Sequence, residues 1–241
     1  MLQYPILSDK ENPMIKFVFL DLDDTLLDFH KAEKAALSKS LVRFGISPED
    51  NILDRYHEIN KAQWERLERG ELTREQVKTE RYRILFSELG VDISPSEFTH
   101  CYEEQLGIGH WFVDGAEELL KALYGKYHLF IASNGALKVQ NSRLDSAEIK
   151  KYFDSIFISE QIGCNKPDKG FFDKCFSKIP CFDSSRAVMI GDSLTSDIKG
   201  GKNAGIKTVW FNQSRCENRT DITPDFEVSA LSQIPDLLKN M

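Results

Sequence analysis

The sequence has few cysteines and no excess of positive charge, and both features restrict the class of protein. Its five cysteines in 241 residues include no Cys-x-x-Cys pair. Neither a disulfide framework nor a zinc site is therefore indicated, and we expect reduced thiols in a cytoplasmic protein. The 31 Lys and Arg residues against 38 Asp and Glu residues give a formal charge of −7. Binding to a nucleic-acid polymer requires a basic surface, so we expect no such partner.

Long hydrophobic runs are also absent. The apolar run of residues 14–20 contains Lys16 and ends at Asp21, far short of the ~20 residues that a membrane-spanning helix needs. Near the N-terminus, Pro5 and the charged run 9–11 interrupt any signal-like segment. We therefore expect no membrane partner and interpret residues 1–13 as a polar N-terminal extension.

Short apolar runs alternate with helical patterns along most of the chain. Nearly continuous apolar character is typical of strands that are covered on both faces, and the alternation of strand and helix is typical of a parallel sheet. The sequence thus predicts an α/β fold with a Rossmann-like parallel sheet. The predicted strands are 16–20, 127–132, 155–158, 187–190 and 208–211, and the predicted helices between them are 116–124, 138–152, 169–177 and 196–204.

One long interval contains helical patterns only. The stretches 32–44, 50–68, 73–89 and 95–105 have helical periodicity. Thr73 followed by Gln76 predicts a capping box at the start of the third stretch. We therefore expect an inserted all-helical cap over residues 30–107, and a catalytic core formed by residues 14–29 and 108–241.

Polar side chains follow four of the predicted strands. The carboxyl ends of parallel strands meet at one edge of a sheet, where ligands bind. We therefore expect residues that are distant in the sequence to lie together there. They are Asp21, Asp23 and Thr25 after the first strand, Ser133 and Asn134 after the second, Lys166 after the third, and Asp192 and Asp197 after the fourth.

Four carboxylates at one edge require compensation, because like charges at short range repel. An all-oxygen set of ligands favours Mg²⁺ over zinc. Mg²⁺ and Lys166 together would leave one negative charge on the four aspartates. We therefore expect Asp23 to be protonated when a dianionic substrate binds.

The Asp-x-Asp spacing suggests phosphoryl chemistry. Asp21 can attack phosphorus and form an aspartyl phosphate, while Asp23 can donate a proton to the leaving group and later accept one from water. Ser133 and Lys166 can hold the phosphoryl oxygens. Asn134 can either contact the phosphate or cap the following helix, and the hydroxyl of Thr25 can orient the loop.

These residues resemble, in order, the four motifs of the haloacid dehalogenase superfamily. The matching segments are Asp21-x-Asp23-x-Thr25, Ser133, Lys166-Pro167-Asp168 and Gly191-Asp192-x₄-Asp197. The resemblance implies a C1-type cap, Asp21 as the nucleophile and Asp23 as the acid/base. It also implies Mg²⁺ held by Asp21, the Asp23 carbonyl and Asp192, with Asp197 orienting that shell. The presence of Asp23 indicates a phosphatase rather than a dehalogenase.

A finer resemblance concerns the substrate, which we expect to be a small phosphorylated metabolite. Ser133-Asn134-Gly135, the segment 157–163 and Asn203-Ala204-Gly205 are similar to the pyrimidine 5′-nucleotidase branch, which implies hydrolysis of pyrimidine nucleoside monophosphates. Phosphoglycolate or sugar-phosphate phosphatase or mutase activity stays open. A receiver-like switch that only accepts a phosphoryl group is a more remote alternative.

The sequence gives no oligomeric state. The five histidines show no mutual metal-ligand spacing, so none is expected to bind a metal ion.

Overall fold

The structure is a computed structural model, and it describes residues 14–241. The predicted extension 1–13 lies outside the described residues. Two compact units are present: a core unit of residues 14–28, 112–137 and 148–241, and a helical unit of residues 29–111 and 138–147. The predicted boundaries of core and cap stay a prediction, and they differ from these units chiefly at residues 138–147.

The core unit is built on a parallel sheet of six strands in the order β3-β2-β1-β4-β5-β6. The α/β fold predicted from the sequence is confirmed. Five strands correspond to the predicted apolar runs, and β6 is additional. The strands are β1 (Phe17–Leu20), β2 (His128–Ser133), β3 (Ser155–Ile158), β4 (Ala187–Gly191), β5 (Lys207–Phe211) and β6 (Phe226–Val228).

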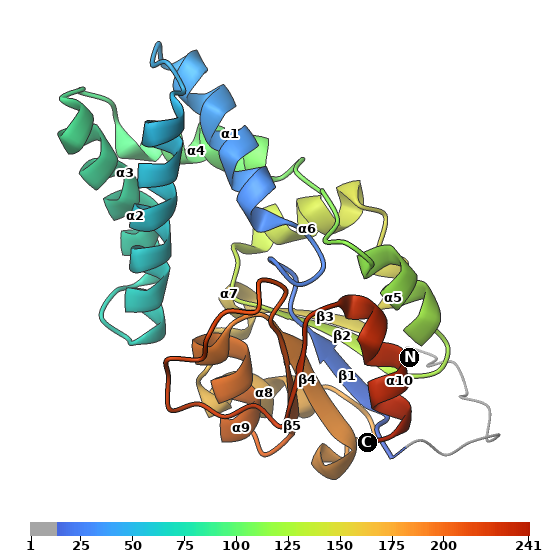
Figure 1. Ribbon diagram of the computed structural model, residues 1–241. Coiled ribbons are helices and arrows are strands. Elements are labelled where there is room, and N and C mark those ends of the chain that lie inside the picture. Colours follow the sequence, from blue (N-terminus) through green and yellow to red (C-terminus); the bar gives the residue numbers. More distant parts are fainter. Residues whose placement is uncertain (1–13) are drawn as a thin grey trace. The chain divides into compact units, whose positions relative to one another are not determined.

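Helices cover both faces of this sheet (Figure 1). Side chains alternate along a strand, so Phe17 and Phe19 of β1 share one face, where they form a buried cluster with Phe171 and Phe172 of α8. Helices α5 and α10 lie together on the opposite face (Figure 1). The helices of the core unit are α5 (Ala116–Leu123), α7 (Ser159–Ile162), α8 (Lys169–Phe176), α9 (Lys199–Asn203) and α10 (Ile234–Lys239).

The helical unit contains no strand among its described residues. Its helices are α1 (Phe29–Arg43), α2 (Asp50–Glu68), α3 (Arg74–Leu89), α4 (Pro95–Leu106) and most of α6 (Leu137–Ser146). The predicted capping box is confirmed, because Gln76 N donates to Thr73 Oγ1 at 3.3 Å and Thr73 N donates to Gln76 Oε1 at 2.8 Å. Tyr56, Tyr82 and Tyr102 are fully buried in its interior.

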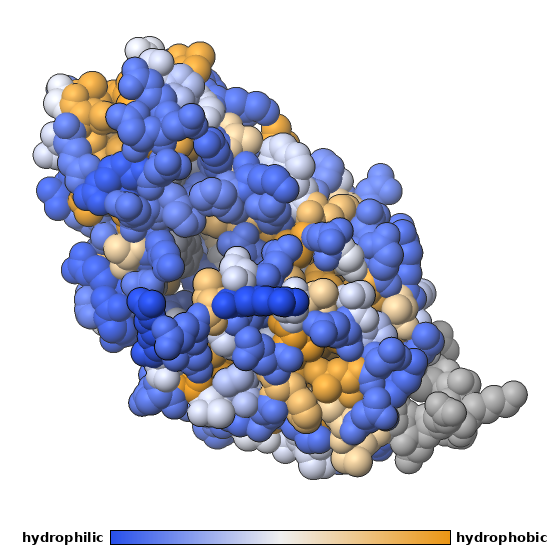
Figure 2. Space-filling view, viewed as in Figure 1, coloured by the Kyte–Doolittle hydropathy of each residue, from blue (hydrophilic) through white to orange (hydrophobic). Residues whose placement is uncertain are grey.

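The surface visible in Figure 2 is mainly hydrophilic, with hydrophobic side chains in small patches. Within residues 14–241, no helix has both the length and the apolar character that crossing a bilayer requires.

Candidate active site

The predicted site residues of the core unit follow neighbouring strands. Asp21 comes directly after β1, and its backbone N–H donates to the Ile190 carbonyl of β4 at 3.0 Å. Asp192 comes directly after β4, and Ser133 is the last residue of β2. Because β2, β1 and β4 are adjacent and parallel, their ends lie side by side. One carboxylate oxygen from each of Asp21, Asp192 and Asp197 lies within 4.8 Å of the others.

Lys166 is the cation of this cluster, and only 1% of its surface is exposed. Its Nζ donates to Asp21 Oδ1 at 2.6 Å, to Asp197 Oδ1 at 2.6 Å and to the Ala132 carbonyl at 2.5 Å. Burial alone would lower the pKa of Lys166, but the ion pairs with Asp197 and Asp21 outweigh it and raise the pKa above its ordinary value. The ammonium group is therefore charged and fixed in position.

One ammonium does not balance three carboxylates. Burial raises the pKa of Asp21 to about 8, against the lowering effect of Lys166, and Asp197 and Asp23 add to the rise. Burial also raises the pKa of Asp192 well above its ordinary value, with further contributions from Asp197 and Asp21. The ionised forms are thus destabilised in the folded protein, and a divalent cation would stabilise them. This oxygen-rich, negatively charged set of donors fits Mg²⁺.

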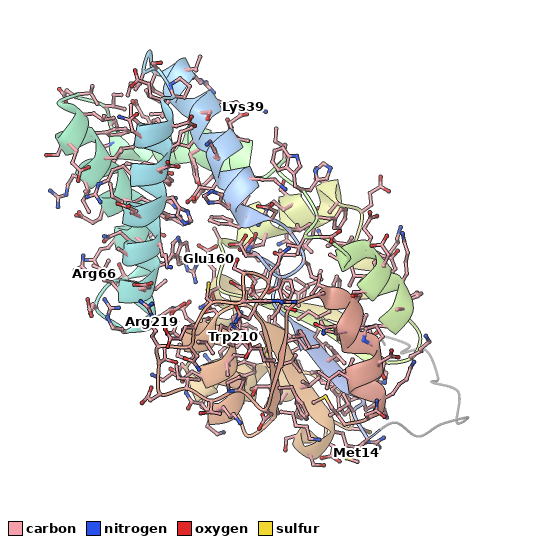
Figure 3. The ribbon with its side chains drawn as sticks, viewed as in Figure 1. Met14, Lys39, Arg66, Glu160, Trp210 and Arg219 are labelled. Atoms are coloured by element: carbon pink, nitrogen blue, oxygen red, sulfur yellow. The ribbon has the colours of Figure 1, made fainter. Side chains whose placement is uncertain are left out.

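Several hydrogen bonds orient the remaining acidic groups. Thr25 Oγ1 donates to Asp192 Oδ1 at 3.2 Å, and Ser193 N donates to Asp197 Oδ2 at 3.1 Å. The indole of Trp210, at the end of β5 (Figure 3), donates from Nε1 to the Asp192 carbonyl at 2.8 Å. Trp210 was not among the predicted site residues, because an apolar strand residue carries no local sign that its indole reaches the residue after a neighbouring strand.

Asn134 joins the end of β2 to the loop that carries Lys166 and to the segment that follows β4. Its Nδ2 donates to the Lys166 carbonyl at 2.9 Å and to Ser196 Oγ at 3.2 Å, while its Oδ1 accepts from Lys166 N at 2.9 Å. Asn134 therefore holds the loop that carries Lys166. Ser133 Oγ accepts from Gly135 N at 3.1 Å. The phosphate-binding roles of Ser133 and Asn134, and the acid/base role of Asp23, stay predictions.

Gly191 leaves room for Asp197 at the end of β4. A Cβ atom at position 191 would overlap the Asp197 side chain, which is 1% exposed and paired with Lys166. We expect Gly191→Ala to lower the free energy of unfolding by about 1–3 kcal/mol, the usual effect of overpacking. Urea-induced unfolding measures this change.

Gly170→Ala is a suitable control in the same unit. There the nearest atom to an added Cβ is Asp168 Oδ1 at 3.2 Å, whereas at position 191 it is Asp197 Oδ2 at a much shorter distance. Equal stability losses in the two variants would contradict the close contact between Gly191 and Asp197.

Comparison with known proteins places this fold and site in a class of enzymes. The family model described as haloacid dehalogenase-like hydrolase matches residues 18–211. The chain belongs to this family, as its motifs predicted, and is a hydrolase.

Particular relatives are similar over nearly their whole length. The chain is 38% identical to pyrimidine 5′-nucleotidase PynA of Streptococcus pneumoniae, covering 92% of this chain and 94% of PynA. It is 30% identical to pyrimidine 5′-nucleotidase YjjG of Escherichia coli, covering 92% and 97%. The crystal structure of the HAD-hydrolase YfnB from Bacillus subtilis bound to magnesium has a TM-score of 0.89 with 34% identity, covering 93% and 98%.

Proposed function

We propose that this protein is a Mg²⁺-dependent phosphomonoester hydrolase that acts through an aspartyl-phosphate intermediate. The observation that carries the proposal is the placement of Asp21. It lies directly after β1, its carboxylate is fixed by Lys166, and carboxylate oxygens of Asp192 and Asp197 lie within 4.8 Å. The proposed nucleophile therefore lies beside a cation and other carboxylates, which supports phosphoryl transfer.

The metal ligands that we propose are the Asp21 carboxylate, the Asp23 backbone carbonyl and the Asp192 carboxylate. A bound Mg²⁺ supplies positive charge that offsets these carboxylates and the phosphoryl oxygens. Support comes from the unbalanced acidic cluster, in which burial raises the pKa values of Asp21 and Asp192. Further support comes from the related YfnB, whose crystal structure contains magnesium.

The chain's own residues provide the proposed steps. An oxygen of Asp21 attacks phosphorus, and the bond between phosphorus and the ester oxygen breaks. Asp23 donates a proton to the departing oxygen, and then accepts one from the water that hydrolyses the aspartyl phosphate. Lys166 and the Ser133 hydroxyl contact the phosphoryl oxygens and stabilise the charge that develops there.

The substrates that we propose are pyrimidine nucleoside 5′-monophosphates. Support comes from the names of the relatives PynA and YjjG, at 38% and 30% identity, together with the site that could bind a phosphate group. Phosphoglycolate and sugar phosphates are the competing substrates. A cytoplasmic location, and the absence of nucleic-acid polymers and membranes as partners, stay predictions from the sequence.

A screen of phosphate release tests both parts of this proposal. With Mg²⁺, we expect repeated turnover on uridine, cytidine and thymidine 5′-monophosphates, with a higher kcat/KM than on adenosine or guanosine 5′-monophosphates, phosphoglycolate or glucose 6-phosphate. Exhaustive chelation should abolish turnover, and Mg²⁺ should restore it, because the carboxylates need a divalent counterion.

Each other outcome has a distinct meaning. Turnover that survives chelation would contradict the metal requirement. A preference for phosphoglycolate or sugar phosphates would overturn the nucleotidase assignment but leave the phosphatase. Intramolecular transfer of the phosphoryl group would indicate a mutase, and a single phosphorylation without turnover would indicate a switch.

A further inference from the structure

A second group of metal-ligand side chains lies within the helical unit. His30 and Glu33 are three residues apart on α1, so they lie on the same face of that helix. His57 comes from α2. One ligand atom from each of these three side chains lies within 4.8 Å of the others. Helical bundles that bind metal ions use a related pair, in Glu-x-x-His order, that faces ligands from other helices; along α1 the order is His30 and then Glu33.

Hydrogen bonds to both oxygens hold the Glu33 carboxylate in place. It is 2% exposed, and its Oε1 accepts from Asn60 Nδ2 at 2.6 Å. Its Oε2 lies 2.5 Å from His57 Nδ1. Asn60 Oδ1 in turn accepts from Nη1 of the buried Arg81 at 2.9 Å. Hydrogen bonds from such outer partners orient a ligand and tune its affinity for the metal.

The two imidazoles lie against each other on the accessible side of the group. The ring centroids of His30 and His57 are 4.6 Å apart, and the rings are nearly perpendicular at 89°. His30 is exposed, and the His57 side chain is 38% exposed. An ion can therefore enter from solvent, and water can complete its coordination.

We propose that His30, Glu33 and His57 bind a divalent first-row transition metal ion of the Zn²⁺ type. Two imidazoles and one carboxylate are a ligand set that suits zinc, whereas Mg²⁺ prefers oxygen ligands. The site is therefore chemically distinct from the acidic cluster of the core unit. The ion joins α1 to α2 through side chains.

The ligand atoms of the three side chains are already close together. Bonds of about 2.0–2.1 Å in a tetrahedral site place ligand atoms about 3.3 Å apart. The contact of 2.5 Å between Glu33 Oε2 and His57 Nδ1 would lengthen toward this separation on binding. The ligand atom of His30 lies within 4.8 Å of the other two.

The test uses Cu²⁺ as the probe and the full chain, after chelation and in an excess of Mg²⁺. We expect one equivalent of Cu²⁺ to bind and to show imidazole-nitrogen coupling in pulsed electron paramagnetic resonance, a signal that the core cluster cannot give because it contains no histidine. His30→Ala should weaken this binding by more than about tenfold, and His57→Ala should do the same. Since His30 is exposed, the His30→Ala variant should fold normally, which circular dichroism checks.

His100→Ala is the matched control. This histidine also lies in the helical unit and is 69% exposed, but its partner is Glu104 on α4. It should keep the affinity and the nitrogen coupling of the unaltered chain. The proposal is wrong if the unaltered chain shows no such coupling, or if His30→Ala and His57→Ala bind as His100→Ala does. Phosphate release does not enter this readout, so the phosphatase proposal stands or fails separately.

Discussion

Asp21→Asn is expected to lower kcat for phosphate release by at least about 10⁴-fold, because it removes the proposed nucleophile and leaves only binding and charge stabilisation. The substitution keeps the size of the side chain and an oxygen that can accept from Lys166 Nζ, which lies 2.6 Å from Asp21 Oδ1. Steady-state kinetics with a pyrimidine nucleoside monophosphate or p-nitrophenyl phosphate measures the loss.

With metal chelated, the same variant is expected to remain folded and to gain stability relative to the unaltered chain as the pH rises from about 4 to about 8. Burial raises the pKa of the Asp21 carboxyl to about 8, so the folded protein keeps a proton that the unfolded chain loses near about pH 4. The stability that this proton provides is present at low pH and is lost as the pH rises through about 8. Asparagine does not ionise, so the variant does not lose stability in this way. The free energy of unfolding of Asp21→Asn relative to the unaltered chain should therefore increase from about pH 4 to about pH 8.

Asp183→Asn provides the control for this prediction. Asp183 is an exposed residue of the core unit that accepts from Ser185 N at 3.0 Å, a role that asparagine can also fill. We expect it to keep full activity. A loss of less than about 100-fold in folded Asp21→Asn would mean that another group attacks phosphorus.

Local patterns predicted much of the fold because they depend on neighbouring residues. Buried strands appear as apolar runs, and the capping box of Thr73 and Gln76 lies within one helical turn. The strand β6 was missed, since Phe226–Val228 is a run of only three residues. The helix predicted over 138–152 ends at Ser146, and Glu148 adopts a left-handed backbone with φ of 57°. Glutamate gives no sequence sign of this conformation.

Topology explains why the acidic residues could be placed together from the sequence, and why their partners could not. The parallel sheet order brings the ends of β1 and β4 side by side, which the strand–helix alternation already implied. The ion pair between Asp21 and Lys166 spans 145 residues, so its geometry depends on packing. For Asn134 we predicted either a phosphate contact or a helix cap, and neither prediction included its hydrogen bonds to the Lys166 backbone. The histidines likewise showed no ligand spacing because His57 approaches His30 from another helix.

Lys166→Met is the second variant with a large expected effect, and it should reduce both stability and activity. It would leave Asp21 and Asp197, which are 7% and 1% exposed, without the ammonium that pairs with both. Removing one partner of a buried ion pair usually lowers the free energy of unfolding by about 3–5 kcal/mol. The loss of a charge that stabilises phosphoryl oxygens should also lower kcat by about 10²–10³-fold.

The stability loss should depend on pH in a defined direction. Without the lysine, the pKa of Asp21 rises further, since the interaction with Lys166 lowers it in the unaltered chain. At about pH 5 the Asp21 carboxyl is protonated and repels Asp197 less, whereas at about pH 8 more of Asp21 is ionised and the repulsion is greater. The deficit relative to the unaltered chain should therefore be larger at about pH 8, as urea unfolding in chelator would measure.

A second substitution separates charge from packing. Adding Asp197→Asn to Lys166→Met removes one of the two carboxylates, so it should recover part of the lost stability, and a double-mutant cycle gives the coupling energy. Catalysis should not recover, because the phosphoryl oxygens still lack the ammonium.

Lys178→Met, at an exposed position of the same unit, should change stability by no more than about 0.5 kcal/mol. A deficit that is equal at both pH values and unaffected by Asp197→Asn would mean that Lys166 contributes through packing rather than charge.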